Sequence, residues 1–202
     1  MLEFKTPQIE DKAWVDQCFK HLKTMNCDYT FGNMFVWSTE YSTKICRFKD
    51  FFICSWGMGK ETNFGIPVGK GDFNEAVEEV IKYAKANDIM PRFYGVTEAY
   101  VEMLNENFPD AFQFSYDESY GDYIYEVEKM ASLKGKKYHG KRNHITNFKK
   151  NNPNWSFETI SKDNIDDCIN LHAKWINTHV DDSDIPPRGG MLYGRHRIFR
   201  NS

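Results

Sequence analysis

Apolar residues recur at helical spacing in two segments of the first half of the chain. Residues 11–23 carry one apolar stripe, and residues 72–85 carry another, so each segment is predicted to form an amphipathic helix. Asp72 and Glu75 have the spacing of a capping box at the start of the second helix. The two stripes consist of Trp14, Val15, Cys18, Phe19 and Leu22, and of Phe73, Ala76, Val77, Val80, Ile81 and Ala84.

Short runs rich in aromatic and β-branched residues alternate with these helices and predict strands. Residues 43–48 and 51–56 are separated by a two-residue turn, as in a hairpin. Further strands are predicted at residues 63–68, 92–96, 112–116 and 123–127, with a short helix between Thr97 and Pro109. Residues 30–37 do not favour either type of element. This order predicts an α+β fold with one mixed, mostly antiparallel sheet flanked by helices.

A second strand and helix are predicted after residue 152. Residues 155–160 have the composition of a strand, and residues 163–179 carry an apolar stripe typical of a helix. Residues 185–202 contain Pro186-Pro187 and Gly189-Gly190 with little apolar periodicity, which predicts an irregular end.

Composition and charge narrow the class of protein. Hydrophobic residues make up 41% of the 202 residues, which predicts a packed core and excludes a disordered chain. The net charge is −3, but residues 134–150 contain seven Lys or Arg, two His and no acid. The other residues carry 19 basic and 29 acidic side chains. This segregation predicts an anion-binding surface on an otherwise acidic protein.

The cysteines and histidines predict neither a metal site nor a disulfide framework. The five cysteines are odd in number and lack C-x-x-C spacing, so we expect reduced thiols in the cytoplasm. The six histidines lack the spacing of paired ligands, so no metal and no other cofactor is predicted. The N-terminus has no apolar signal core, and no apolar run reaches the roughly 18 residues of a membrane span.

The basic segment, defined as residues 134–150, is the first candidate for a binding site. On a helix starting near Gly140, Arg142 shares a face with Ile145 and Phe148, where its guanidinium could be held rigid for a phosphate or carboxylate. The alternative is a set of solvated lysines with Arg142 extended along the apolar face. The predicted anion-binding or substrate-binding residues are Lys134, Lys136, Lys137, His139, Lys141, Arg142, Asn143 and His144.

A second, weaker phosphate candidate is Gly69-Lys70-Gly71, directly before the helix at Asp72. Backbone amides of Gly69 and Gly71 and the helix dipole could hold a phosphate there. The longer glycine-rich nucleotide fingerprints are absent, and a tight strand-to-helix turn is the favoured alternative. No catalytic residue is predicted, because neither Cys27 nor Cys46 has a base visible in the sequence.

Several short motifs in a fixed order resemble those of one bacterial family. That family is a domain-of-unknown-function group related to the C-terminal domain of phosphatidylglycerol lysyltransferase, and the resemblance extends from about residue 4 to residue 180. The motifs are Phe31-Gly32-Asn33-x-x-x-Trp37, Pro67-x-Gly69-x-Gly71-Asp72, Asp122-Tyr123-Ile124-Tyr125, Leu133-Lys134-Gly135-Lys136-Lys137 and Lys141-Arg142-Asn143-His144-Ile145 with Phe148.

The resemblance implies two GNAT-like modules in tandem. The first would span residues 1–130, the basic connecting segment residues 131–152, and the start of a second module residues 153–202. The irregular tail departs from the family pattern. We therefore expect an incomplete second module in a chain that looks truncated, and whether it is an active enzyme stays open.

The resemblance also implies a function. Relatives of this architecture act as aminoacyl- or acyltransferases, so the expected donor is an aminoacyl-tRNA or an acyl-CoA and the expected acceptor includes an anionic lipid headgroup. Lys136, Lys137, Lys141 and Arg142 would face the anionic donor or acceptor, at a location peripheral to the membrane. One alternative is a non-catalytic module that binds anionic lipid or RNA through the basic segment. Another is a structural protein whose lysines pair with the acids of residues 163–184.

Overall fold

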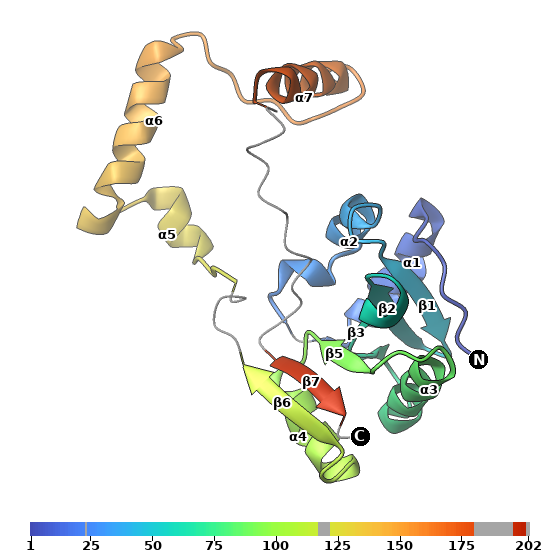
Figure 1. Cartoon of the computed structure of the whole chain (residues 1–202). Helices are drawn as coiled ribbons and strands as arrows, with labels where there is room; N and C mark the ends of the chain where they lie inside the picture. The colour runs from blue at the N-terminus through green and yellow to red at the C-terminus, as the bar shows by residue number, and fades with distance from the viewer. Residues whose placement is uncertain (23, 117–121, 180–195, 201–202) are drawn as a thin grey trace. The chain divides into compact units, whose positions relative to one another are not determined.

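A computed structural model of the chain describes residues 1–22, 24–116, 122–179 and 196–200 (Figure 1). The chain divides into two units, the first formed by residues 1–123 with 189–202 and the second by residues 124–188. The predicted ends of the first module at residue 130 and of the basic connecting segment at residue 152 stay predictions. In the described ranges, no helix combines the length and the apolar character that crossing a membrane requires.

The first unit contains a mixed sheet and its helices. The helices are η1 (Ile9–Asp11), α1 (Lys12–Phe19), η2 (Cys27–Tyr29), α2 (Phe31–Trp37), η3 (Gly59–Glu61), α3 (Phe73–Ala86) and α4 (Glu98–Asn107). The strands are β1 (Lys44–Phe48), β2 (Phe51–Trp56), β3 (Asn63–Gly65), β4 (Val68–Gly69), β5 (Arg92–Tyr94), β6 (Phe112–Tyr116) and β7 (His196–Arg200). The strand order is β1-β2-β3-β5-β7-β6, with β4 beside β2. The pairing of β3 with β5 is parallel and the other strand pairs are antiparallel, as the sequence predicts.

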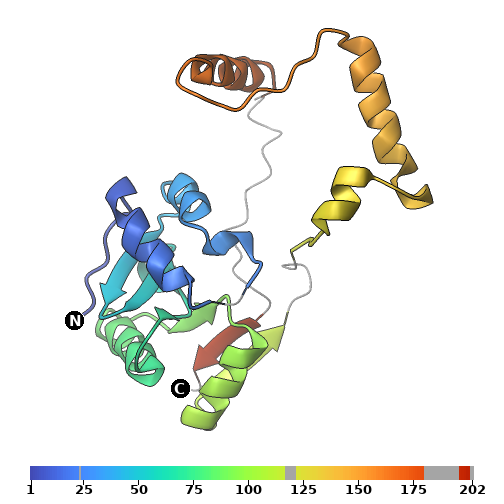
Figure 2. The ribbon, with the colours of Figure 1, turned by 180° about the vertical axis from the view of Figure 1, so that it is seen from behind.

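Strand β2 is buried on both faces, and its alternate residues enter two different hydrophobic clusters. Phe51 and Ile53 pack in the cluster that contains the apolar face of α3. Phe52 and Cys54 pack in the cluster that contains residues of α1 and α2. Successive strand side chains point to opposite faces, so these helices cover opposite sides of the sheet, as Figures 1 and 2 show.

The start of α3 follows its predicted cap in part. The Glu75 amide donates to Asp72 Oδ1 over 3.1 Å, as an N-cap requires. The Glu75 carboxylate pairs instead with Lys49 Nζ, at the turn between β1 and β2. The predicted capping box therefore becomes a single cap plus a link to the hairpin.

Tyr29 fixes η2 against the segment that follows β5. Its hydroxyl is buried and donates to the Gly95 carbonyl over 3.1 Å. Gly95 has a φ of +74°, and a Cβ added there would lie 2.0 Å from Tyr29 Oη. Only glycine suits this position, because it combines the backbone conformation with the close approach of the tyrosine.

The second unit contains four described helical segments. They are α5 (Val127–Ser132), η5 (Lys136–Tyr138), α6 (His139–Asn151) and α7 (Ile165–His179). Many of its large apolar side chains are exposed, including Phe148 at 54% and Trp175 at 52%. Among the side chains of this unit whose burial the structure describes, only Tyr138 is fully buried.

Three expectations about regular structure are wrong. Residues 123–126 form no strand, and Tyr123 is 88% exposed. The neighbour of β6 is β7, so residues 196–200 form a strand where an irregular end was expected. Residues 155–160 also form no strand and are exposed. Strand composition alone did not suffice in either segment, because a strand also needs a hydrogen-bonding partner.

Candidate functional site

The basic segment folds as η5 followed by α6. Gly135, at a φ of +98°, ends the preceding loop and allows the chain to enter η5. The predicted site residues are exposed, apart from the half-buried Arg142. The predicted helix near Gly140 is confirmed, with α6 beginning at His139.

Arg142 is held by backbone oxygens. Its Nη1 donates to the Gly135 carbonyl over 2.9 Å and also to the Leu133 carbonyl. Leu133 is the left-handed C-cap residue of α5, so the guanidinium joins α6 to the loop that follows α5. A guanidinium that is free to bind an anion was expected here. One of its nitrogens, Nη1, instead donates to carbonyls of the loop.

The remaining basic side chains contact neighbours within the segment. Lys137 Nζ lies 4.9 Å from the ring centroid of Tyr138, and His139 Nε2 lies 3.1 Å from Asn143 Nδ2. Over residues 122–179, no ion pair joins Lys134, Lys136 or Lys141 to a carboxylate. The described acids of α7 therefore do not neutralise these lysines. The reading in which they pair with residues 163–184 gains no support, although residues 180–184 lie outside the described residues.

The turn at Gly69-Lys70-Gly71 has a packing explanation. A Cβ at Gly69 would lie 2.1 Å from the Asp50 carbonyl oxygen, and Gly71 has a φ of +133°. The Lys70 amide donates to that same carbonyl over 3.4 Å. The tight-turn alternative therefore accounts for both glycines, and the phosphate role of Gly69 and Gly71 stays a prediction.

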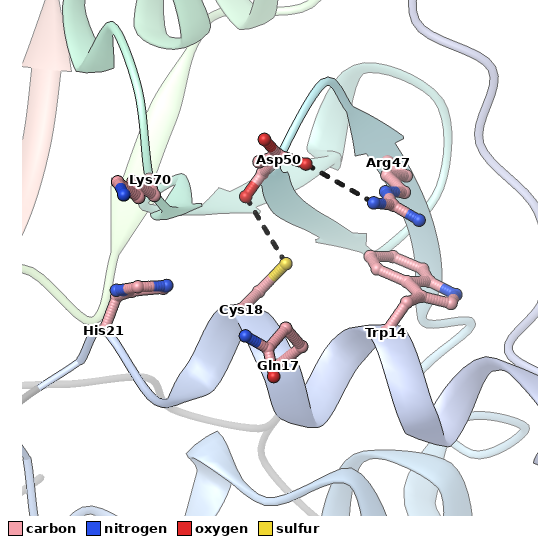
Figure 3. A pocket seen from close by; sticks show the side chains of 7 residues that line it. All are labelled: Trp14, Gln17, Cys18, His21, Arg47, Asp50 and Lys70. Atoms are coloured by element: carbon pink, nitrogen blue, oxygen red, sulfur yellow. Dashed lines mark hydrogen bonds and ion pairs between the residues drawn. The ribbon is translucent and has the colours of Figure 1, made fainter.

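Beside this turn lies a pocket of about 250 Å³ that sequence reasoning missed. Figure 3 shows side chains from α1 facing those of the β1–β2 hairpin, with Lys70 at one side. The lining residues are Trp14, Gln17, Cys18, His21, Arg47, Asp50 and Lys70. The helical spacing of Trp14, Cys18 and His21 was visible in the sequence, but their meeting with the hairpin depends on the fold.

The polar groups of the pocket are oriented by the hairpin. Arg47 Nε donates to the Lys49 carbonyl over 3.1 Å, and Arg47 Nη2 lies 3.4 Å from Asp50 Oδ1. Cys18 Sγ donates to the Asp50 carbonyl over 3.5 Å. Burial raises the pKa of the Cys18 thiol, an effect that the Arg47 charge opposes and the Asp50 charge supports. The thiol is therefore a protonated wall of the pocket and a poor nucleophile at neutral pH.

A half-buried carboxylate, Asp28, lies where two of the sequence motifs meet. Asn33 Nδ2 donates to Asp28 Oδ1 over 2.9 Å. Cys27 Sγ donates to Asp122 Oδ1 over 3.9 Å, which brings the second motif to the same place. Burial raises the pKa of Asp28 to about 6, the Asp122 charge adds to the effect, and the Asn33 bond opposes it. This raised pKa could not be predicted from the sequence, because burial and the proximity of Asp122 depend on the fold.

The sequence model of the family described as "Phosphatidylglycerol lysyltransferase, C-terminal" matches residues 19–194. The chain belongs to this family. The resemblance identified from the motifs is confirmed. A search of curated proteins found no significant match.

Two solved structures support the fold. A conserved protein of unknown function from Bacteroides thetaiotaomicron VPI-5482 is 30% identical with a TM-score of 0.79 over 92% of this chain. The C-terminal domain of a protein assigned as a lysylphosphatidylglycerol synthetase, from Agrobacterium fabrum, is 14% identical with a TM-score of 0.51 over 83% of this chain. This chain spans 62% of the first structure's chain and 51% of the second's. The predicted α+β class, with one mixed and mostly antiparallel sheet flanked by helices, is confirmed.

Proposed function

We propose that this chain is part of an aminoacyltransferase that takes its acyl group from an aminoacyl-tRNA, with the basic segment contacting the tRNA phosphates. The observation that carries the proposal is the cluster of lysines on η5 and α6 without acidic partners among the described residues. A surface of one sign of charge attracts a polyanion and raises its association rate. Family membership supports the transferase class, whereas the donor and acceptor belong to the proposal.

The chemistry of such a transfer needs little covalent participation by the protein. The acceptor amine or hydroxyl attacks the carbonyl carbon of the aminoacyl ester and loses a proton. The bond to the terminal ribose oxygen then breaks, and that oxygen takes up a proton and leaves as a hydroxyl of the tRNA. Catalysis consists mainly of holding the two reactants in line and stabilising the developing oxyanion. Lys136, Lys137 and Lys141 would contribute to positioning, because they would hold the donor tRNA by its phosphates.

The test compares two variants with the same loss of charge. Labelled tRNA is titrated against wild type, Lys136/Lys137/Lys141→Ala and a control triple variant at two salt concentrations. The control replaces Lys20, Lys44 and Lys85, which are exposed lysines of the first unit. Arg142 is left intact, because its bonds to the loop make a variant there ambiguous.

The two triple variants should behave differently if the basic segment contacts phosphates. The binding constant falls as the salt concentration rises, and each lost phosphate contact reduces the magnitude of that slope (log K against log salt) by about 0.7 to 0.9. We expect the basic-segment variant to bind more weakly with a shallower slope, and the control to follow wild type. Equal affinities and slopes for all three proteins would overturn the proposal.

A second candidate function is a non-catalytic module that docks on anionic lipid, at a location peripheral to the cytoplasmic side of a membrane. The specific observation is that α6 exposes apolar side chains beside its lysines, with Ile145 at 45% and Phe148 at 54%. A helix that is basic on one side and apolar on another suits a membrane surface. Co-sedimentation with anionic but not neutral vesicles, combined with no tRNA binding, would favour this candidate.

A further inference from the structure

We propose that the pocket between α1 and the β1–β2 hairpin binds a small organic anion that combines a phosphate or carboxylate with a flat apolar group. The pocket lies wholly in the first unit, whereas the basic segment lies in the second. The proposal therefore concerns a separate site and does not depend on tRNA binding.

The charges around the pocket favour an anion. Arg47 and Lys70 are positive, Asp50 is the negative lining residue, and His21 adds a further polar group. Asp50 contacts Arg47 through one oxygen at 3.4 Å, a distance longer than that of a strong ion pair. In the described ranges, Lys70 forms no ion pair. One cationic side chain thus remains uncompensated at the pocket.

The guanidinium of Arg47 is held in place before any ligand arrives. Its Nε is fixed by the Lys49 carbonyl, and its central carbon lies 5.8 Å from the ring centroid of Trp14. Trp14 is itself fixed, because its Nε1 donates to Asp11 Oδ1 over 2.9 Å. A planar fork of donors with few rotamers left to lose matches the oxygens of a phosphate or carboxylate.

The side of the pocket formed by α1 favours the flat apolar group of the ligand. Trp14 and Cys18 lie on one face of α1, and they present an indole ring and a protonated thiol to the cavity (Figure 3). The indole offers apolar aromatic surface beside the Arg47 guanidinium, which favours a flat group next to the anion. Gln17 and His21 add hydrogen-bonding groups to the same wall. The cavity of about 250 Å³ is slightly smaller than the pockets of drug-sized ligands, roughly 300–1,000 Å³, so a single substituted ring is the expected size.

Lys70 reaches the pocket because the backbone at Gly69 lies so close to the hairpin that a side chain at position 69 would not fit. Gly69 lets the turn before α3 lie against Asp50, with only 2.1 Å available between a Cβ and the carbonyl oxygen. Lys70 follows directly and lines the pocket. A packing role for Gly69 and a binding role for Lys70 are therefore compatible.

Phenyl phosphate is the probe for this site, with inorganic phosphate and phenol as its two halves. Each is titrated into the full chain, and binding is followed by amide and indole NMR shifts. We expect phenyl phosphate to bind most tightly and to shift the Trp14 indole and the Lys70 amide. Shifts confined to residues 134–150, or no binding up to about 5 mM, would overturn the proposal.

Three charge-neutralising variants separate a built site from general electrostatics. Arg47→Gln and Lys70→Gln should each weaken phenyl phosphate by about tenfold, the effect of losing one charged hydrogen bond. Lys44→Gln removes the same charge from an exposed position on β1 outside the lining and should leave affinity unchanged. Lys70 is exposed, so its variant keeps the test decisive if Arg47→Gln fails to fold. Equal affinities for Lys70→Gln and Lys44→Gln would overturn the assignment.

Discussion

Replacing Asp28 by Asn should remove a pH-dependent loss of stability from the first unit. Burial and the neighbouring Asp122 raise the pKa of Asp28 from 3.8 to about 6, although the Asn33 hydrogen bond favours the ionised form. An increase of about two in the pKa corresponds to about 3 kcal/mol between the two protonation states. The side chain is only half-buried, so solvent screening reduces the expected effect to about 1–2 kcal/mol.

The sign follows from the proton balance between the folded and unfolded states. Below about pH 4 the carboxyl is protonated in both states, and the penalty is absent. Between about pH 4 and 6 the unfolded chain ionises first, so the folded state loses stability as the pH rises. Above about pH 6 the full penalty is present, because Asp28 is then ionised in both states.

Urea denaturation at a series of pH values measures this effect. The free energy of unfolding of Asp28→Asn should exceed that of wild type by about 1–2 kcal/mol at pH 8, and the gap should close towards pH 4. Glu102→Gln neutralises an exposed acid of α4 and should show no such trend. A constant gap between pH 4 and 8, or one that widens as the pH falls, would refute the reasoning.

Three further substitutions test local features. Gly69→Ala should lower the free energy of unfolding by about 2–3 kcal/mol in urea titrations, because its Cβ would meet the Asp50 carbonyl; an unchanged midpoint would show that the turn can move. Gly140→Ala, with no atom within 4 Å of the added Cβ, should stabilise α6 by about 0.5 kcal/mol and slow amide exchange there; faster exchange would contradict this. Arg142→Lys keeps the charge but loses the planar Nη1 that donates to both loop carbonyls, so amide protection near residue 138 should fall by about 1–2 kcal/mol; unchanged protection would contradict this.

Locally specified elements could be predicted from the sequence. The β1–β2 hairpin was found because its two strands and their turn are adjacent, and α3 was found because its stripe and cap lie within 15 residues. Residues 123–127 were misassigned because the place beside β6 is taken by β7, which lies about 80 residues later in the chain. Pairing between distant segments leaves no trace in local composition.

The candidate sites also differ in whether their residues lie close together in the sequence. The helix that carries Arg142 was predicted from residues within it. The contacts that hold the guanidinium were not predicted, because they come from the carbonyls of Leu133 and Gly135, whereas Ile145 and Phe148 are exposed. The pocket was missed because its lining comes from three segments between residues 14 and 70. Asp28 was missed because burial and the charge of Asp122 produce its pKa, and neither is visible in neighbouring residues.

The contact of Tyr29 with Gly95 also constrains how relatives of this chain can diverge. Any side chain at position 95 would collide with the tyrosine hydroxyl, and Tyr29→Phe would leave the Gly95 carbonyl without that donor. A smaller residue at 29 would relieve the collision, but a side chain at 95 would still be strained at a φ of +74°. We therefore expect glycine at position 95 in relatives whatever residue stands at position 29. Position 29 is the freer of the two, and its replacement costs the hydrogen bond to the Gly95 carbonyl.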